Sequence, residues 1–174
     1  MQTLKLNRLK AAAVVLSLIA TATTASADRT PTVPEALSVT NGDKVEFHAY
    51  AVGVQIYSWN AATAKWVFVA PEAVLYDSDG NVVGIHYAGP TWETESGSKV
   101  VGVRIAGVTV DANSIPWLLL QAKTAEGPGV LANTTYVQRV NTAGGLAPSV
   151  AGTADGEIAR VPYTAEYYFY RAQN

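Results

Sequence analysis

Hydrophobic and polar residues alternate along this chain with the period of β-strands. Between residues 44 and 50 (KVEFHAY) every second side chain is apolar, which predicts a strand with one buried face. Seven further segments are rich in β-branched and aromatic residues, as strands are. They cover residues 53–59, 65–69, 73–76, 82–87, 99–110, 135–140 and 163–170.

Turn-forming residues separate these segments. Examples are residues 77–81 (DSDGN), the pair Gly89 and Pro90, and residues 126–129 (EGPG). Short strands separated by such turns predict an all-β fold, a single antiparallel β-sandwich or barrel-like domain with short connecting loops. We expect this domain to cover residues 35–174, after a loose N-terminal arm at residues 28–34.

One segment leaves the choice between strand and helix open. Residues 114–123 (SIPWLLLQAK) place Pro116 where the first turn of a helix would accept it. The apolar run that follows is too short to establish a helical period. We favour a buried strand.

The first 27 residues have the pattern of an export signal. Lys5, Arg8 and Lys10 precede a short apolar run at residues 11–20, and Ala25-Ser26-Ala27 supplies the small residues before a cleavage site. The run is too short to span a membrane, and no later segment is long and apolar enough. We therefore expect a periplasmic or extracellular protein that begins near Asp28.

Charge and cysteine content exclude several classes of function. The leader carries three of the 12 basic residues, so the remaining chain has nine basic residues against 14 acidic ones. Those cations are scattered, whereas nucleic acids and anionic membranes require a clustered basic face. With no cysteine, the chain has neither disulfides nor thiolate metal ligands.

The sequence gives little support for a cofactor, a metal site or a hydrolase nucleophile. His48 and His86 lie on different predicted strands, and neither has a second histidine at chelating spacing. Residues 77–81 resemble the start of a calcium loop, but Ala88 stands where a ligating Glu is needed, so we predict a hairpin turn. Residues 96–99 match S-x-x-K only in composition.

The most distinctive group of side chains surrounds Gly89 and Pro90. His86, Trp92 and Glu93 flank this stiff bend, which could hold them ready for a ligand. Alternatively, Trp92 caps the core and bonds through its indole N–H. Glu93 and Glu95 are also spaced like paired glycosidase carboxylates, but solvated charges on a polar strand face explain them as well.

Arg139 is the fourth candidate for ligand binding. It shares a strand face with Val137, whereas Gln138 and Val140 share the other face. A buried cation needs a partner, and we expect Glu72 or Glu93 to pair with it. If Arg139 instead faces an open cleft, it would bind an anion.

Six blocks of sequence together point to a family. They are VQIY (54–57), APEA (70–73), GIHYAGPTWE (84–93), IPWLL (115–119), VQRVNT (137–142) and PYTA (162–165). With these blocks, the chain resembles the domain-of-unknown-function 3455 family of exported microbial and fungal proteins, from about Val33 to Tyr170. The resemblance implies no known activity or ligand. It also implies that many relatives carry cysteines where this chain has Ser58 and Thr153.

Two hypotheses follow. The first is a non-catalytic binding module for a small molecule, a polysaccharide or an envelope protein, with His86, Trp92, Glu93 and Arg139 as candidate ligand-binding residues. The second is a cofactor-independent enzyme that uses His86 or Glu93 as general acid or base, because histidine titrates near neutral pH. The sequence favours the first hypothesis, and it fixes neither the ligand nor the oligomeric state.

Overall fold

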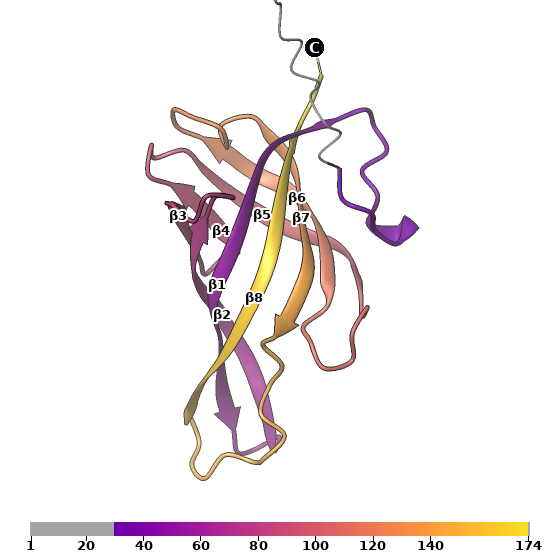
Figure 1. Ribbon diagram of the computed structural model, residues 1–174. Coiled ribbons are helices and arrows are strands. Elements are labelled where there is room, and N and C mark those ends of the chain that lie inside the picture. Colours follow the sequence, from indigo (N-terminus) through magenta and orange to yellow (C-terminus); the bar gives the residue numbers. More distant parts are fainter. Residues whose placement is uncertain (1–29, 174) are drawn as a thin grey trace, which may run out of the picture.

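A closed β-barrel forms the body of the protein. The computed structural model describes residues 30–173, and these contain eight antiparallel strands. Each strand pairs with the next, and β8 returns to pair with β1 (Figure 1). The all-β prediction is therefore confirmed. The strands are β1 Lys44–Asn60, β2 Lys65–Tyr76, β3 Val82–Tyr87, β4 Thr91–Thr94, β5 Lys99–Val108, β6 Trp117–Glu126, β7 Thr134–Gly144 and β8 Ile158–Arg171.

Two strands are longer than the sequence pattern predicts. The segments 44–50 and 53–59 form one strand, β1, and the segments 65–69 and 73–76 join through Pro71 to form β2. Pro71 pairs with Gln55 of β1, but β2 pairs with β3 only from Ala73 onward. The missing N–H of Pro71 therefore costs no ladder bond to β3, as is usual where proline occurs in a strand.

The region around Gly89 and Pro90 is a hairpin rather than a loop beside a strand. Residues 91–94, which the pattern did not predict as a strand, form β4, and His86 lies directly opposite Trp92 in the β3–β4 register. Gly89 has a φ of 109°, which favours glycine in the connecting turn. The segment 114–123 does contain a strand, although β6 begins only at Trp117.

The barrel interior is filled by alternate side chains from every wall. Tyr163, Tyr167 and Phe169 of β8 point inward and pack with Trp92. This agrees with the predicted period-two order of residues 163–170. The same cluster of buried side chains includes Leu75, Val100, Leu120 and Val137.

A second buried layer lies on the outer face of β5, β6 and β7. There the short 3-10 helix η1 (Glu35–Leu37) packs beside the barrel (Figure 1). Leu37 and Gln138 are fully buried, and Gln138 Nε2 donates a 2.6 Å hydrogen bond to the Leu37 carbonyl oxygen. Tyr170 donates to Gln138 Oε1 from the neighbouring strand. In the structure the arm continues through η1, where Leu37 is bonded to the barrel wall.

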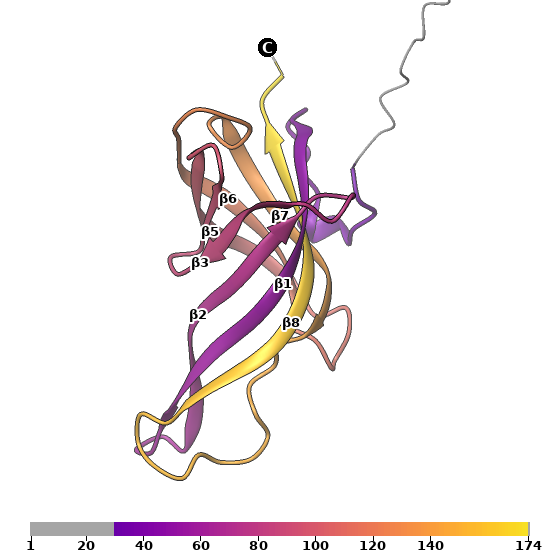
Figure 2. The same cartoon turned by 60° about the vertical axis from the view of Figure 1, so that its left-hand side comes forward.

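The barrel wall is uneven in height. β1, β2 and β8 extend well beyond the others at one end (Figure 2), whereas β3 has only six residues and β4 four. Where β3 and β4 form the wall, it therefore ends at the turn that joins them. Among the described residues, no helix is long and apolar enough to cross a membrane. The predicted leader, residues 1–27, lies outside the described residues.

Candidate functional site

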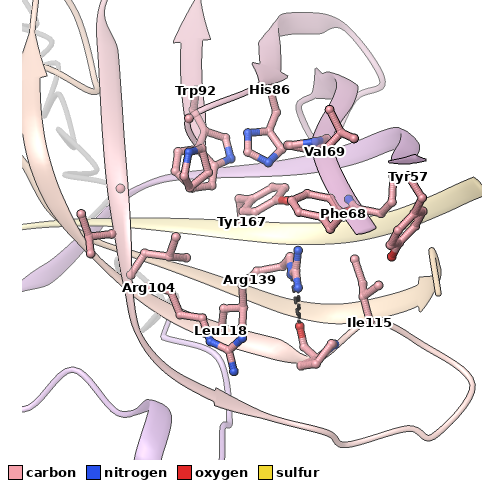
Figure 3. Close-up of a pocket in the computed structure, with 18 residues that line it drawn as sticks. Tyr57, Phe68, Val69, His86, Trp92, Arg104, Ile115, Leu118, Arg139 and Tyr167 are labelled. Carbon is pink, nitrogen blue, oxygen red and sulfur yellow. Dashed lines mark hydrogen bonds between the residues drawn. The ribbon is translucent and has the colours of Figure 1, made fainter. Parts of the chain in front are cut away.

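A cavity of about 700 Å³ opens beneath the short β3–β4 hairpin (Figure 3). One side is formed by the start of β2, and the opposite side by the middle of β5 and the start of β6. Arg139 of β7 and Tyr167 of β8 reach it from the barrel interior. The cavity is therefore the part of the barrel interior that the shortened wall leaves uncovered.

Most of the lining is apolar. The mouth carries two large apolar side chains that are about half exposed, Phe68 (51%) and Val69 (55%). Deeper, the walls are made of aromatic, proline and aliphatic side chains. These include Tyr57, Pro71, Pro90, Trp92, Ile115, Pro116, Leu118 and Leu120.

Arg139 points into this cavity and has no carboxylate partner among residues 30–173. Its Nε and Nη2 atoms donate to the Pro116 carbonyl oxygen at 3.2 and 2.8 Å. The expected pairing with Glu72 or Glu93 is wrong. Glu72 pairs with Arg160, and Glu93 accepts a hydrogen bond from the Tyr87 hydroxyl. Arg139 therefore matches the alternative in which it faces an open cleft.

Tyr167 lies beside Arg139 both in register and in space. The two residues are directly opposite each other in the β7–β8 ladder, and the guanidinium interacts with the Tyr167 hydroxyl. Burial raises the pKa of Tyr167, and Arg139 only partly offsets that rise. The phenol therefore remains neutral, so it cannot neutralise the arginine.

His86 forms the opposite wall of the cavity and is 3% exposed. Its Nδ1 lies 2.8 Å from the Thr91 carbonyl oxygen, which can only accept, so Nδ1 carries the proton. Burial lowers the pKa of His86 to about 3, and the positive charge of Arg139 acts in the same direction. His86 is thus a neutral imidazole whose Nε2 is an acceptor.

Trp92 is a core residue, as the structural alternative predicted, but among residues 30–173 its indole N–H does not form the bond that this alternative included. It is 1% exposed and belongs to the core, and its indole also lines the cavity. Within the described part of the chain, Trp92 Nε1 has no hydrogen-bond partner, and neither does Gln55 Nε2, although the Gln55 amide lies beside the Tyr163 hydroxyl. Buried donors without a partner are uncommon in proteins and cost free energy.

Glu93 does not belong to the cavity. Because strand side chains alternate, Glu93 points away from Trp92 to the outer face, where it lies opposite the exposed Ile85. Of the four candidate ligand-binding residues, the structure places His86, Trp92 and Arg139 around one cavity and Glu93 outside it. His86 and Glu93, the alternative candidates for a general acid or base, therefore lie on opposite faces of the sheet.

Several lining residues were not among the sequence candidates. Gln55, Tyr57 and Tyr167 reach the cavity from the long strands β1 and β8, and Arg104 lies at its edge on β5. Tyr167 lies within the predicted strand segment 163–170. The signal that was missed is polar Gln55 between apolar neighbours, on the same strand face as buried Ala51.

The remaining sequence candidates lie elsewhere. Asp77 accepts bonds from the backbone N–H groups of Asp79 and Asn81 and from the Asn81 amide, which stabilises a tight turn. These bonds, led by the Asn81 side chain, lower the pKa of Asp77. Within residues 30–173, no three His, Cys, Asp or Glu side chains are grouped so that they could hold a metal ion.

Comparison with known proteins identifies a family but no function. Searches of curated proteins and of solved structures gave no match. The family model described as "Protein of unknown function (DUF3455)" matches residues 40–171, from just before β1 to the last residue of β8. This match covers the whole barrel and confirms the resemblance drawn from the six sequence blocks. The chain belongs to the DUF3455 family.

Proposed function

We propose that this protein is an exported, non-catalytic binding module that holds a small molecule in the cavity beneath the β3–β4 hairpin. The observation that carries the proposal is Arg139, a cation without a carboxylate partner among the described residues, in a largely apolar cavity. Small-molecule sites typically combine an apolar wall with a few convergent polar groups.

The size and lining of the cavity support a small molecule over the other ligands considered. A volume of about 700 Å³ lies within the range of small-molecule sites, roughly 300–1,000 Å³. A polysaccharide would need many polar partners along an extended groove, whereas the walls here are mainly aliphatic and aromatic. A protein partner would require a larger contact surface than this recess offers.

The positions of the protons favour binding over catalysis. A general acid or base works best when its pKa lies near the working pH. Burial lowers the pKa of His86 to about 3, far below neutrality, and the one proton of the neutral ring is donated to the Thr91 carbonyl oxygen. Among the described residues that line the cavity there is no Asp or Glu to replace it.

Nile red, a neutral dye whose emission rises in apolar surroundings, tests the proposal directly. We expect saturable emission with the native protein and a loss of at least about tenfold in affinity for Leu118→Trp, which fills part of the cavity. Val82→Trp, at an exposed position outside the cavity, is the matched control. Near-UV circular dichroism verifies that each variant is folded.

Equal dye binding by the Leu118→Trp variant and the native protein, or no saturable binding by either, would refute the cavity as a ligand site. A loss confined to the Leu118→Trp variant supports it.

The export part of the proposal depends on the basic and apolar pattern of the first 27 residues and on the family resemblance. N-terminal sequencing of the protein recovered from outside the cytoplasm should begin near Asp28. A cytoplasmic product that keeps the basic leader would contradict export without affecting the cavity.

A further inference from the structure

We infer that the ligand is a monocarboxylate with an apolar body and a hydroxyl or N–H donor, its carboxylate bound by Arg139 and its donor bound by His86 Nε2. This inference depends on the proposed function and deepens it by naming the ligand class. Three features of the cavity carry it: the free donors of Arg139, the charge balance of the lining, and the tautomer of His86.

Arg139 has N–H groups to spare and is already held in place. A guanidinium has five N–H donors. Two donate to the Pro116 carbonyl oxygen, and the guanidinium lies beside the Tyr167 hydroxyl, so at least two N–H groups remain for a ligand. The bonds to Pro116 fix the orientation of the guanidinium plane, so little rotamer freedom remains to be lost on binding.

The charge of the lining selects an anion. Arg139 and Arg104 both line the cavity, and neither forms an ion pair within residues 30–173. No carboxylate among the described residues lies in the lining to compensate them. A partly desolvated cation is stabilised strongly by an opposite charge, and charge-assisted hydrogen bonds are about twice as strong as neutral ones.

A single carboxylate fits these donors better than a phosphate does. Two N–H groups on one guanidinium match the two oxygens of a carboxylate. A phosphate monoester carries nearly two negative charges and three acceptor oxygens. Only one cation, Arg139, reaches inside the cavity to balance that charge, because Arg104 lies at the exposed edge. The apolar walls would then cover the rest of the molecule.

His86 fixes the other end of the ligand. Because Nδ1 donates to Thr91, Nε2 offers a lone pair and repels a second carboxylate. A hydroxyl or N–H group satisfies it. Tyr167 lies between the two polar groups: its ring centroid is 5.1 Å from that of His86, and its hydroxyl is beside Arg139 (Figure 3). The acid and the donor of the ligand should therefore be separated by about the length of one tyrosine side chain.

Displacement of Nile red provides the test, with 3-(4-hydroxyphenyl)propanoate as the probe. We expect the acid to displace the dye at a concentration at least about tenfold lower than its primary alcohol or its amide, as loss of a charged hydrogen bond implies. The analogue 3-phenylpropanoate, which lacks the hydroxyl, should bind several-fold more weakly than the probe. These comparisons use the unaltered protein, so no variant has to fold.

Variants then assign the two contacts. Arg139→Met should abolish the preference for acid over alcohol, and Arg139→Lys should retain part of it. His86→Phe should abolish the preference for the hydroxylated acid. Arg171→Met is the matched control, because it removes an arginine that pairs with Glu46 outside the cavity. It should leave both preferences unchanged.

The outcomes separate this inference from the proposed function. If Nile red binds in the cavity but acids and alcohols displace it equally, the monocarboxylate assignment is overturned and the binding module stands. The assignment is also overturned if the preference for acid survives in Arg139→Met. If the dye does not bind saturably, the binding module itself is refuted.

Discussion

The imidazole of His86 and the indole of Trp92 lie face to face, with ring centroids 4.4 Å apart and an angle of 8° between their planes. The β3–β4 register places these residues directly opposite each other, and Tyr167 packs against both rings. Residues directly opposite each other on neighbouring antiparallel strands have their Cβ atoms close enough for the side chains to touch. The stacked pair is therefore both a part of the core and a wall of the cavity.

Burial of His86 makes the stability of the protein dependent on pH. The pKa of His86 is about 3 in the folded state and 6.5 as a free side chain, so between these values the unfolded chain binds more protons. Stability from this residue is fully present above pH 6.5 and falls as the pH drops toward 3. The expected slope approaches about 1.4 kcal/mol per pH unit.

Urea unfolding at a series of pH values between 7 and 4 measures this slope. His86→Gln, which cannot gain the proton, should reduce the slope, whatever its effect at pH 7. The control is His48→Gln, which removes the other histidine. His48 lies on β1, and its Nε2 is 2.9 Å from Glu166 Oε2. An unchanged slope in His86→Gln would show that the acid sensitivity arises elsewhere.

Replacement of Trp92 should destabilise the fold as well as alter the cavity. Trp92→Ala removes a fully buried indole that contacts His86, Tyr167 and Phe169. Truncation of a buried tryptophan costs about 3–5 kcal/mol. Val82→Ala, at an exposed β3 position, should change the free energy of unfolding by less than about 0.5 kcal/mol. A loss below 1 kcal/mol for Trp92→Ala would mean that this core site is loosely packed.

The strand content was predictable because period-two alternation is a local property. Residues 82–87 were predicted with the bounds that β3 has. The alternation also puts Tyr163 and Tyr167 on one shared face, which the structure shows to be the inner one. Strand ends were less predictable, since β2 continues through Pro71 where one neighbour is missing and β4 is only four residues long. These features depend on pairing partners that are distant in the sequence.

The cavity was only partly predictable for the same reason. The bend at Gly89 and Pro90 pointed to His86 and Trp92, which do line the cavity. Local alternation could not reveal that Arg139 lacks a carboxylate partner, because that depends on which strands surround β7 once β8 pairs with β1 and closes the barrel. Glu93 looked suitable in sequence, yet its position next to Trp92 necessarily turns it outward.

The contact between the N-terminal arm and the barrel should contribute substantially to stability. Leu37→Ala removes a fully buried side chain from the outer layer and should cost about 2–5 kcal/mol in urea unfolding. Gln138→Leu removes the hydrogen-bond donor to the buried Leu37 carbonyl oxygen and should cost about 1–3 kcal/mol.

Limited proteolysis separates loss of the arm contact from global unfolding. Both variants should be cut first near residues 30–38, before the barrel is degraded. Glu35→Ala, at an exposed position of η1, provides the control and should resist cleavage like the native protein. Simultaneous cleavage throughout the chain would instead indicate that the arm and barrel unfold as one unit.

A polar substitution at the mouth of the cavity should affect binding more than folding. Val69 is about half exposed and lines the entrance from β2. Because this side chain is already largely solvated, Val69→Ser should lower the free energy of unfolding by less than about 1 kcal/mol. A bound molecule would lose apolar contact with it. The variant should therefore bind Nile red about five- to tenfold more weakly, as loss of about 1 kcal/mol of apolar burial implies. Val52→Ser, at a similarly exposed position on β1 outside the lining, tests whether any exposed valine has this effect. Equal weakening by Val52→Ser would mean that the dye binds to the general apolar surface, whereas weakening only at the mouth identifies the entrance.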